Sequence, residues 1–220
     1  MTEPRRWQSE ADRLAHADPS DPTAWFERLW ASAAAGDVTT PWDRDDPHPV
    51  LASWPGLPEP GSGDGRAVVV GCGLGADAEL LARLGYETTA FDVSPAAVAA
   101  ARERHPGSRV TYAVGDLLDL PTDWVAAFDL VVEIHTVQAV NRSVRDQLTA
   151  GVRALVAPGG TLLAIQARTD VAADDGPPWP LTREEIDAFG RRGLSAVRVE
   201  ELPGFGGGGA GMSRAEFRRG

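Results

Sequence analysis

The chain has 220 residues, of which 43% are hydrophobic and 24% charged, values typical of a globular protein with room for one α/β domain and an appendage. Its net charge of -11 argues against a nucleic-acid partner, because neutralisation of phosphates dominates such binding. The single cysteine, Cys72, excludes an intrachain disulfide. Without a signal-peptide core or an apolar run of about 18 residues, we expect a cytoplasmic protein with no membrane partner.

The first 60 residues differ from the rest because they hold five of the seven tryptophans, Trp7, Trp25, Trp30, Trp42 and Trp54. A helix is predicted from Asp21-Pro22 to about Ala35, with its apolar residues on one face. A Pro-rich stretch at 40–49 and a short helix follow. We expect residues 1–60 to form an N-terminal helical lid, joined by the Gly- and Pro-rich segment 55–65 to a domain of residues 61–220.

Strands and helices alternate from residue 66 onward. The predicted strands span 66–71, 86–91, 109–114, 128–134 and 160–167, and the predicted helices span 76–84, 95–104, 143–156 and 182–191. This alternation favours a mainly parallel sheet with helices on both faces, a three-layer α/β sandwich. Two further strands, 194–202 and 212–219, are separated only by a Gly-rich loop. They must pair antiparallel, which predicts a seven-stranded sheet with an antiparallel last strand.

A glycine-rich turn follows the first of these strands. Gly71, Gly73 and Gly75 stand at alternate positions before a helix, where glycine lets the backbone turn sharply and approach a ligand. The helix would direct its free N–H groups to the same place. Asp92 ends the next apolar run, about 20 residues after Gly71, a spacing at which a carboxylate binds ribose hydroxyls. An ordinary strand–helix turn with a surface Asp is the alternative.

Acidic residues stand at the carboxyl ends of three predicted strands, where open α/β sheets bind ligands. Asp92 ends the second strand, Asp116 follows the third, and Glu133 ends the fourth. A ligand with a ribose, an exocyclic amine and an ammonium group would suit these carboxylates. Asp116 could instead be a turn residue that bonds its own backbone, and Glu133 could face solvent.

Residues 66–167 resemble the class I methyltransferases that use S-adenosylmethionine. The segments that carry the resemblance are 71–77, 91–94, 115–116, 128–133 and 155–161. It implies a Rossmann-like fold and S-adenosylmethionine as the cofactor, with residues 61–220 as the methyltransferase domain. The donor contacts that it implies are Gly71, Cys72 and Gly73 at the methionine part, Asp92 and Val93 at the ribose, Asp116 and Leu117 at the adenine, and Glu133.

The N-terminal segment resembles the thiopurine, thiol and halide methyltransferase group. The matching residues are Trp30 and the Pro-Trp-Asp segment at 41–43. In that group the N-terminal helix and this segment fold over the donor, which implies that Phe26, Trp30 and Trp42 line the pocket around the methyl group. The tryptophans could also simply pin the arm to the domain. Ile134 stands where some thiopurine enzymes carry an Arg, which argues against a thiopurine acid as substrate.

His135 is the candidate catalytic residue, because the other histidines fall in the arm or at a surface helix end. A neutral histidine could take a proton from an attacking hydroxyl, amine or thiol. It could also be a hydrogen-bonded residue beside the methionine part of the donor. No metal site is expected, since the chain has neither a cysteine pair nor a His-x-x-x-His motif.

The sequence therefore predicts transfer of a methyl group from S-adenosylmethionine to a small acceptor such as a thiol or a halide. One alternative is an NAD(P)-dependent oxidoreductase, because Gly71, Gly73 and Ala76 also fit the dinucleotide pattern. Another is a module that binds the donor without catalysis. The oligomeric state is not predicted.

Overall fold

The computed structural model describes residues 11, 13–14, 22–40, 42–172, 176–204 and 211–220. Trp7, Asp21 and Pro41, the first residue of the Pro-Trp-Asp segment, lie outside these residues. The described strands are β1 (Arg66–Val70), β2 (Glu87–Asp92), β3 (Thr111–Val114), β4 (Phe128–Ile134), β5 (Val156–Arg168), β6 (Leu194–Leu202) and β7 (Gly211–Arg219). The described helices of four residues or more are α2 (Ala24–Ala34), α3 (Pro49–Ala52), α4 (Ala76–Leu84), α5 (Pro95–Arg104), α6 (Arg142–Leu155) and α7 (Arg183–Asp187).

The strands form one seven-stranded sheet in the order β3-β2-β1-β4-β5-β7-β6. The pairs among β1 to β5 are parallel, and β7 is antiparallel to both of its neighbours. Residues 67–70 of the central strand β1 are all buried, as expected for a strand covered on both faces. The predicted seven-stranded sheet with an antiparallel last strand is confirmed.

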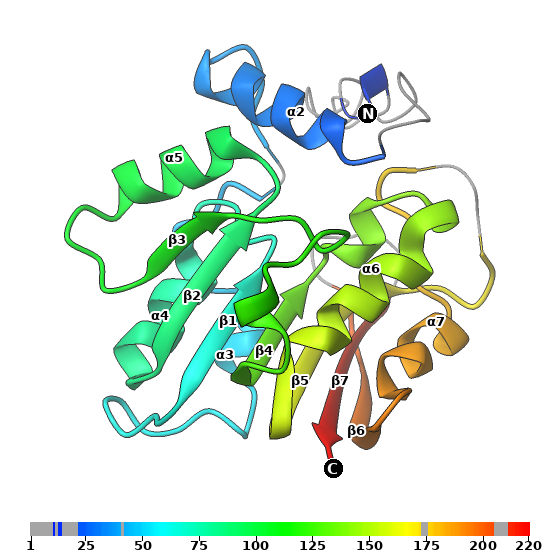
Figure 1. The fold of residues 1–220 in the computed structure, drawn as a ribbon. Coiled ribbons are helices and arrows are strands. Elements are labelled where there is room, and N and C mark those ends of the chain that lie inside the picture. Colours follow the sequence, from blue (N-terminus) through cyan, green and yellow to red (C-terminus); the bar gives the residue numbers. More distant parts are fainter. Residues whose placement is uncertain (1–10, 12, 15–21, 41, 173–175, 205–210) are drawn as a thin grey trace.

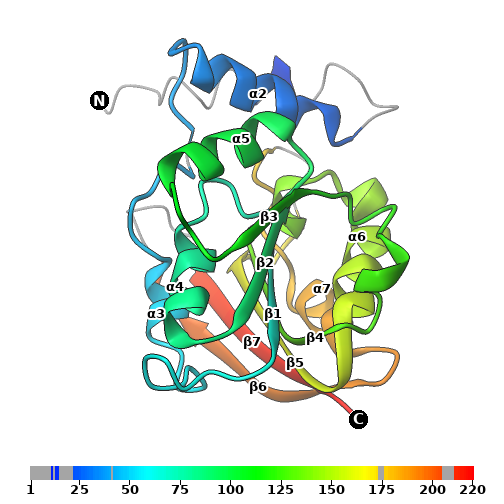
Figure 2. The same cartoon turned by 60° about the vertical axis from the view of Figure 1, so that its left-hand side comes forward.

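Helices cover both faces of this sheet. Side chains of α3, α4 and α5 pack in one apolar cluster with one face, and side chains of α6 and α7 pack in a second cluster with the other. Figures 1 and 2 show the resulting three layers, with α2 lying across the carboxyl ends of the parallel strands. The predicted three-layer α/β sandwich is therefore confirmed, and α2 stands at the edge where ligands bind in such sheets.

Local sequence signals account for several helix ends. Ser94 caps α5 through its hydroxyl, and Thr182 with Glu185 forms the expected capping box of α7. The predicted helix 182–191 is shorter than expected, because its last turn, Ala188–Gly190, tightens into a 3-10 helix. The strand predicted at 160–167 is longer, since Val156 already pairs with Phe128. Within the described residues, no helix has the length and apolarity needed to cross a membrane.

Candidate functional site

A cavity lies between α2 and the carboxyl ends of β1, β2 and β4. Its empty volume, including the open mouth, is about 640 Å³. The sheet contributes the glycine turn after β1, the ends of β2 and β4, and the segment after β3. The arm contributes aromatic side chains from α2 and from the segment after it. The cavity therefore joins the two parts of the chain that the sequence analysis links to the donor.

The glycine turn has backbone angles that favour glycine, and at Gly71 a side chain would also not fit. Gly71 has φ +60°, and a Cβ there would lie 2.4 Å from the hydroxyl oxygen of Thr136. Gly73 has φ +50°, and its Cβ position faces the Trp30 ring at 3.4 Å. Both glycines line the cavity, so their bare backbone forms part of its wall.

Cys72 lies in the same turn but is not among the residues that line the cavity. Its side chain packs against the apolar cluster beneath the turn, and this burial raises the pKa of its thiol well above the usual range. The geometry therefore offers only the backbone of Cys72 for a donor contact, and the predicted role stays a prediction.

Asp92 lies at the end of β2 and reaches the cavity beside Val93. One carboxylate oxygen accepts the backbone N–H of Gly73 at 3.1 Å, and the other accepts that of Ser94 at 3.0 Å. Burial raises the pKa of Asp92 to about 6, although these backbone hydrogen bonds oppose the shift. The Val93 backbone N–H also contributes to these bonds, and because a carboxylate has about four lone-pair sites, Asp92 can still accept from a ligand hydroxyl.

Asp116 and Leu117 line the cavity on the side of β3. Asp116 accepts the backbone N–H of Leu118 at 2.8 Å, as the turn interpretation predicts. Only one of its oxygens is used in this bond, so its position in the wall is compatible with a ligand contact as well. Both interpretations of Asp116 remain open.

Glu133 is fully buried, which contradicts the alternative that it faces solvent. One oxygen accepts the backbone N–H groups of Thr136 at 2.8 Å and of Val137 at 2.9 Å, and the other accepts from the Gln166 amide. Burial raises its pKa to about 7. Because Glu133 does not line the cavity, the geometry favours a role in shaping the turn after β4 over direct donor binding.

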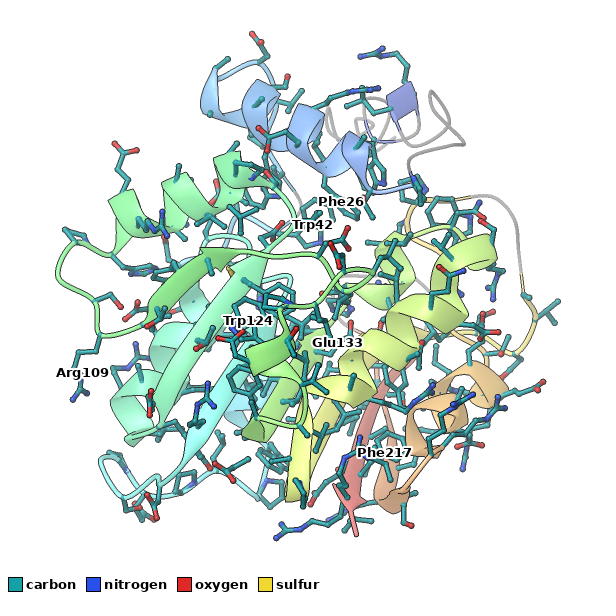
Figure 3. All side chains as sticks on the ribbon, viewed as in Figure 1. Phe26, Trp42, Arg109, Trp124, Glu133 and Phe217 are labelled. Atoms are coloured by element: carbon teal, nitrogen blue, oxygen red, sulfur yellow. The ribbon has the colours of Figure 1, made fainter. Side chains whose placement is uncertain are left out.

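Phe26, Trp30 and Trp42 form the aromatic wall of the cavity. The Trp42 ring centroid lies 6.1 Å from that of Phe26 and 6.1 Å from that of Trp30. Figure 3 shows Phe26 and Trp42 between α2 and the strand ends. Trp30 is also buried against α5 and the glycine turn, so the same side chain can pin the arm and line the cavity.

Two polar residues of the arm were missed by sequence reasoning. Glu27 on α2 accepts the Ser94 hydroxyl at 2.5 Å and the Ala96 backbone N–H at 3.1 Å, so it ties α2 to the first turn of α5. His48, assigned to the arm away from the site, lies against His135 with their Nε2 atoms 3.3 Å apart. No local pattern identifies either contact, because both join segments far apart in the sequence.

His135 lines the cavity at the end of β4. Burial lowers its pKa to about 4, and the side chain of Gln138 partly opposes this shift. The ring is therefore neutral at pH 7, as a proton acceptor must be. Its Nε2 faces His48, however, so the lone pair of this atom is less available to take a proton from the methyl acceptor.

The cavity has the features that an adenosyl sulfonium requires. A buried carboxylate with free lone pairs can accept from ribose hydroxyls, and a bare glycine turn allows close approach of the backbone. Aromatic rings nearby favour a cation through their faces. The residues present therefore fit S-adenosylmethionine.

Comparisons with known proteins agree with this geometry. Residues 67–160 match the family model described as a methyltransferase domain. A probable thiol methyltransferase 2 of Arabidopsis thaliana is 28% identical over 82% of this chain and 77% of its own length. A ubiquinone biosynthesis O-methyltransferase of Xanthomonas axonopodis is 36% identical over 49% of this chain, which spans only 45% of that relative.

Solved structures share the fold. The protein from a study of the conversion of a disulfide bond into a thioacetal group during echinomycin biosynthesis has a TM-score of 0.69 and 22% identity, covering 88% of this chain and 93% of its own. The glycopeptide N-methyltransferase MtfA in complex with S-adenosylmethionine has a TM-score of 0.60 and 19% identity, and the match covers 83% of this chain and 100% of the MtfA chain. Together, the matched methyltransferase domain, the relatives and the shared fold support a class I S-adenosylmethionine-dependent methyltransferase that resembles the thiol methyltransferase branch.

Proposed function

We propose that this methyltransferase acts on a small, uncharged or soft nucleophile, of which a thiol is the first candidate. The observation that carries the proposal is the composition of the cavity wall. Aromatic and aliphatic side chains dominate it, and among the described residues no Arg lines it. The carboxylate of an acidic acceptor would be buried against such a wall without a cationic partner, and its desolvation would cost much free energy. The thiol methyltransferase relative supports the same class of acceptor.

In this proposal the residues of the sheet hold the donor. Asp92 accepts from the ribose hydroxyls, the backbone at Gly71 to Gly73 lies against the methionine part, and Asp116 with Leu117 lies beside the adenine. S-adenosylmethionine supplies an electrophilic methyl group on its sulfonium. The alternative of an NAD(P)-dependent oxidoreductase is not supported, because the matched family and relatives are methyltransferases.

In the same proposal the arm shapes the acceptor side. Phe26, Trp30 and Trp42 exclude water and present ring faces toward a cation, which favours the sulfonium while the nucleophile is aligned. A thiolate needs little help from a base, because its sulfur already carries the charge. The aromatic wall and the donor-holding edge of the sheet thus account together for a covered site with a small acceptor.

The test is methyl transfer from labelled S-adenosylmethionine to two matched thiols, thiophenol and 2-mercaptobenzoate. We expect thiophenol to be methylated with the higher kcat/KM, because the carboxylate of 2-mercaptobenzoate finds no Arg in the wall. Iodide, a phenol and an aromatic amine complete the panel. A preference for 2-mercaptobenzoate, or transfer confined to the phenol or the amine, would contradict the proposed acceptor class.

A further inference from the structure

The pair formed by His48 and His135 joins the arm to the sheet at the cavity. The backbone of each residue is anchored by a hydrogen bond. The His48 backbone N–H donates to Asp77 at 2.6 Å, and the His135 backbone N–H donates to the Ile165 carbonyl at 3.0 Å. The ring centroids lie 5.1 Å apart in an edge-to-face arrangement. His135 adopts φ 61°, an uncommon conformation for a residue other than glycine.

One backbone donor fixes the protons on both rings. Nδ1 of His48 accepts the Val50 backbone N–H at 3.2 Å as the N-cap of α3, so it carries no proton. The proton of the neutral His48 ring therefore sits on Nε2, which can only donate. The atom 3.3 Å away is Nε2 of His135, which must accept and so carries no proton. The proton of His135 consequently sits on Nδ1.

This assignment leaves neither ring nitrogen of His135 available to take a proton. Nε2 faces His48, so its lone pair is occupied. Nδ1 carries the proton and is buried in the protein, so it is not exposed to a molecule in the cavity. The Gln138 side chain interacts with the same ring through a hydrogen bond that raises the pKa of His135, as an oxygen that accepts from a ring N–H does.

We infer that His48 is a positioning residue that holds His135 in its Nδ1-protonated form with its Nε2 lone pair turned to His48, so that His135 is not the base that receives the proton of the methyl acceptor. The role of His135 toward the methyl acceptor rests on the proposed function, whereas the proton assignment does not. The surrounding charges agree with a neutral pair. Arg44 disfavours a second positive charge on either ring, and Asp77, which faces the same segment, is paired with Arg44 at 3.2 Å.

Nuclear magnetic resonance of the imidazole nitrogens in the full chain tests this inference without an acceptor. At pH 7 we expect His135 to show the pattern of an Nδ1-protonated neutral ring and His48 that of an Nε2-protonated one. A wild-type His135 that is charged at pH 7 or protonated on Nε2 would overturn the inference, whatever the variants do.

Two substitutions of His48 separate its two hydrogen bonds. In His48→Asn the side-chain oxygen can still cap α3 but is too short to reach His135, so we expect His135 to gain the Nε2-protonated form. In His48→Gln the amide N–H can replace the donor toward His135, so the Nδ1-protonated form should persist. Unchanged protonation of His135 in a folded His48→Asn protein would also overturn the inference. The expected spectra with no methyl transfer to any thiol would contradict the proposed function alone.

Discussion

The sheet region of residues 66–168 and the arm of residues 24–54 line the same cavity, yet they depend on the sequence in different ways. In the sheet region each element carries its own signal, such as the glycine turn after β1 or the carboxylate that ends β2. In the arm, the contacts that hold the elements in place are made to distant residues, as from Glu27 to Ser94. The difference suggests that the sheet holds the donor and that the arm shapes the acceptor side of the cavity.

The largest effect is expected from Asp92→Ala, which tests the donor half of this division. The substitution removes the ribose acceptor and leaves the N–H groups of Gly73 and Ser94 without their partner. We expect the Kd for S-adenosylhomocysteine to rise about 30- to 100-fold, corresponding to about 2–3 kcal/mol for bonds to a charged group. Calorimetric titration measures it, with the exposed Asp119→Asn as the matched control. An unchanged Kd in a folded Asp92→Ala protein would break the assignment.

The pH dependence of donor binding tests the same role of Asp92. Because the pKa of buried Asp92 is about 6, its carboxylate is ionised at pH 7 and protonated at pH 5. A neutral carboxyl accepts more weakly from ribose hydroxyls, so we expect the Kd to rise about tenfold from pH 7 to pH 5.

The pH dependence of folding stability has the opposite sign to that of donor binding. The folded pKa of Asp92 exceeds the ordinary value of 3.8, so the folded protein binds this proton more tightly than the unfolded chain. The contribution of Asp92 to the free energy of unfolding therefore falls as the pH rises from about 4 through 6. Asp92→Asn should remove both dependences, and an equally steep binding curve in this variant would assign the effect to another group.

These two regions also show what the sequence could and could not predict. The strands at 66–71 and 128–134 follow from continuous apolar runs, because a strand buried on both faces needs no partner to be recognised. The placement of Asp92 in the cavity wall follows from strand order, since neighbouring parallel strands end at one edge. Glu133 shows the limit of that argument, because its side chain turns into the protein and bonds the next turn.

The arm was predicted less completely, for a physical reason. Helical spacing identified the apolar face of α2, including Leu29 and Trp30, which are both buried. The pairing of His48 with His135 depends on how the Pro-rich segment crosses α4, where the His48 backbone is held by Asp77. A tertiary contact of this kind leaves no periodic signal, so only the structure could place His48 beside the cavity.

A tryptophan pair tests whether the arm acts on the acceptor side. Trp42 lines the cavity from the arm, whereas Trp124 packs on Phe91 of the sheet, with ring centroids 5.0 Å apart. We expect Trp42→Ala to lower kcat/KM for a thiol about fivefold, as the loss of one ring–cation or packing contact of about 1 kcal/mol would. Trp124→Ala should lower the melting temperature while leaving kcat/KM of the folded protein near that of the wild type. Equal losses of kcat/KM in both variants would erase the distinction between arm and sheet.

The smallest effect is expected from Glu27→Ala, which tests how the arm is attached. The carboxylate accepts two hydrogen bonds at the start of α5, so its removal should weaken the docking of α2 by about 1 kcal/mol. We expect the amide protons of α2 to exchange about fivefold faster and KM for the thiol to rise about threefold, while the Kd for S-adenosylhomocysteine changes less. The exposed neighbour Arg28→Ala is the control. If Glu27→Ala weakened donor binding as strongly as Asp92→Ala, the arm and the sheet would have to be treated as one donor site, because Glu27 and Asp92 meet through Ser94.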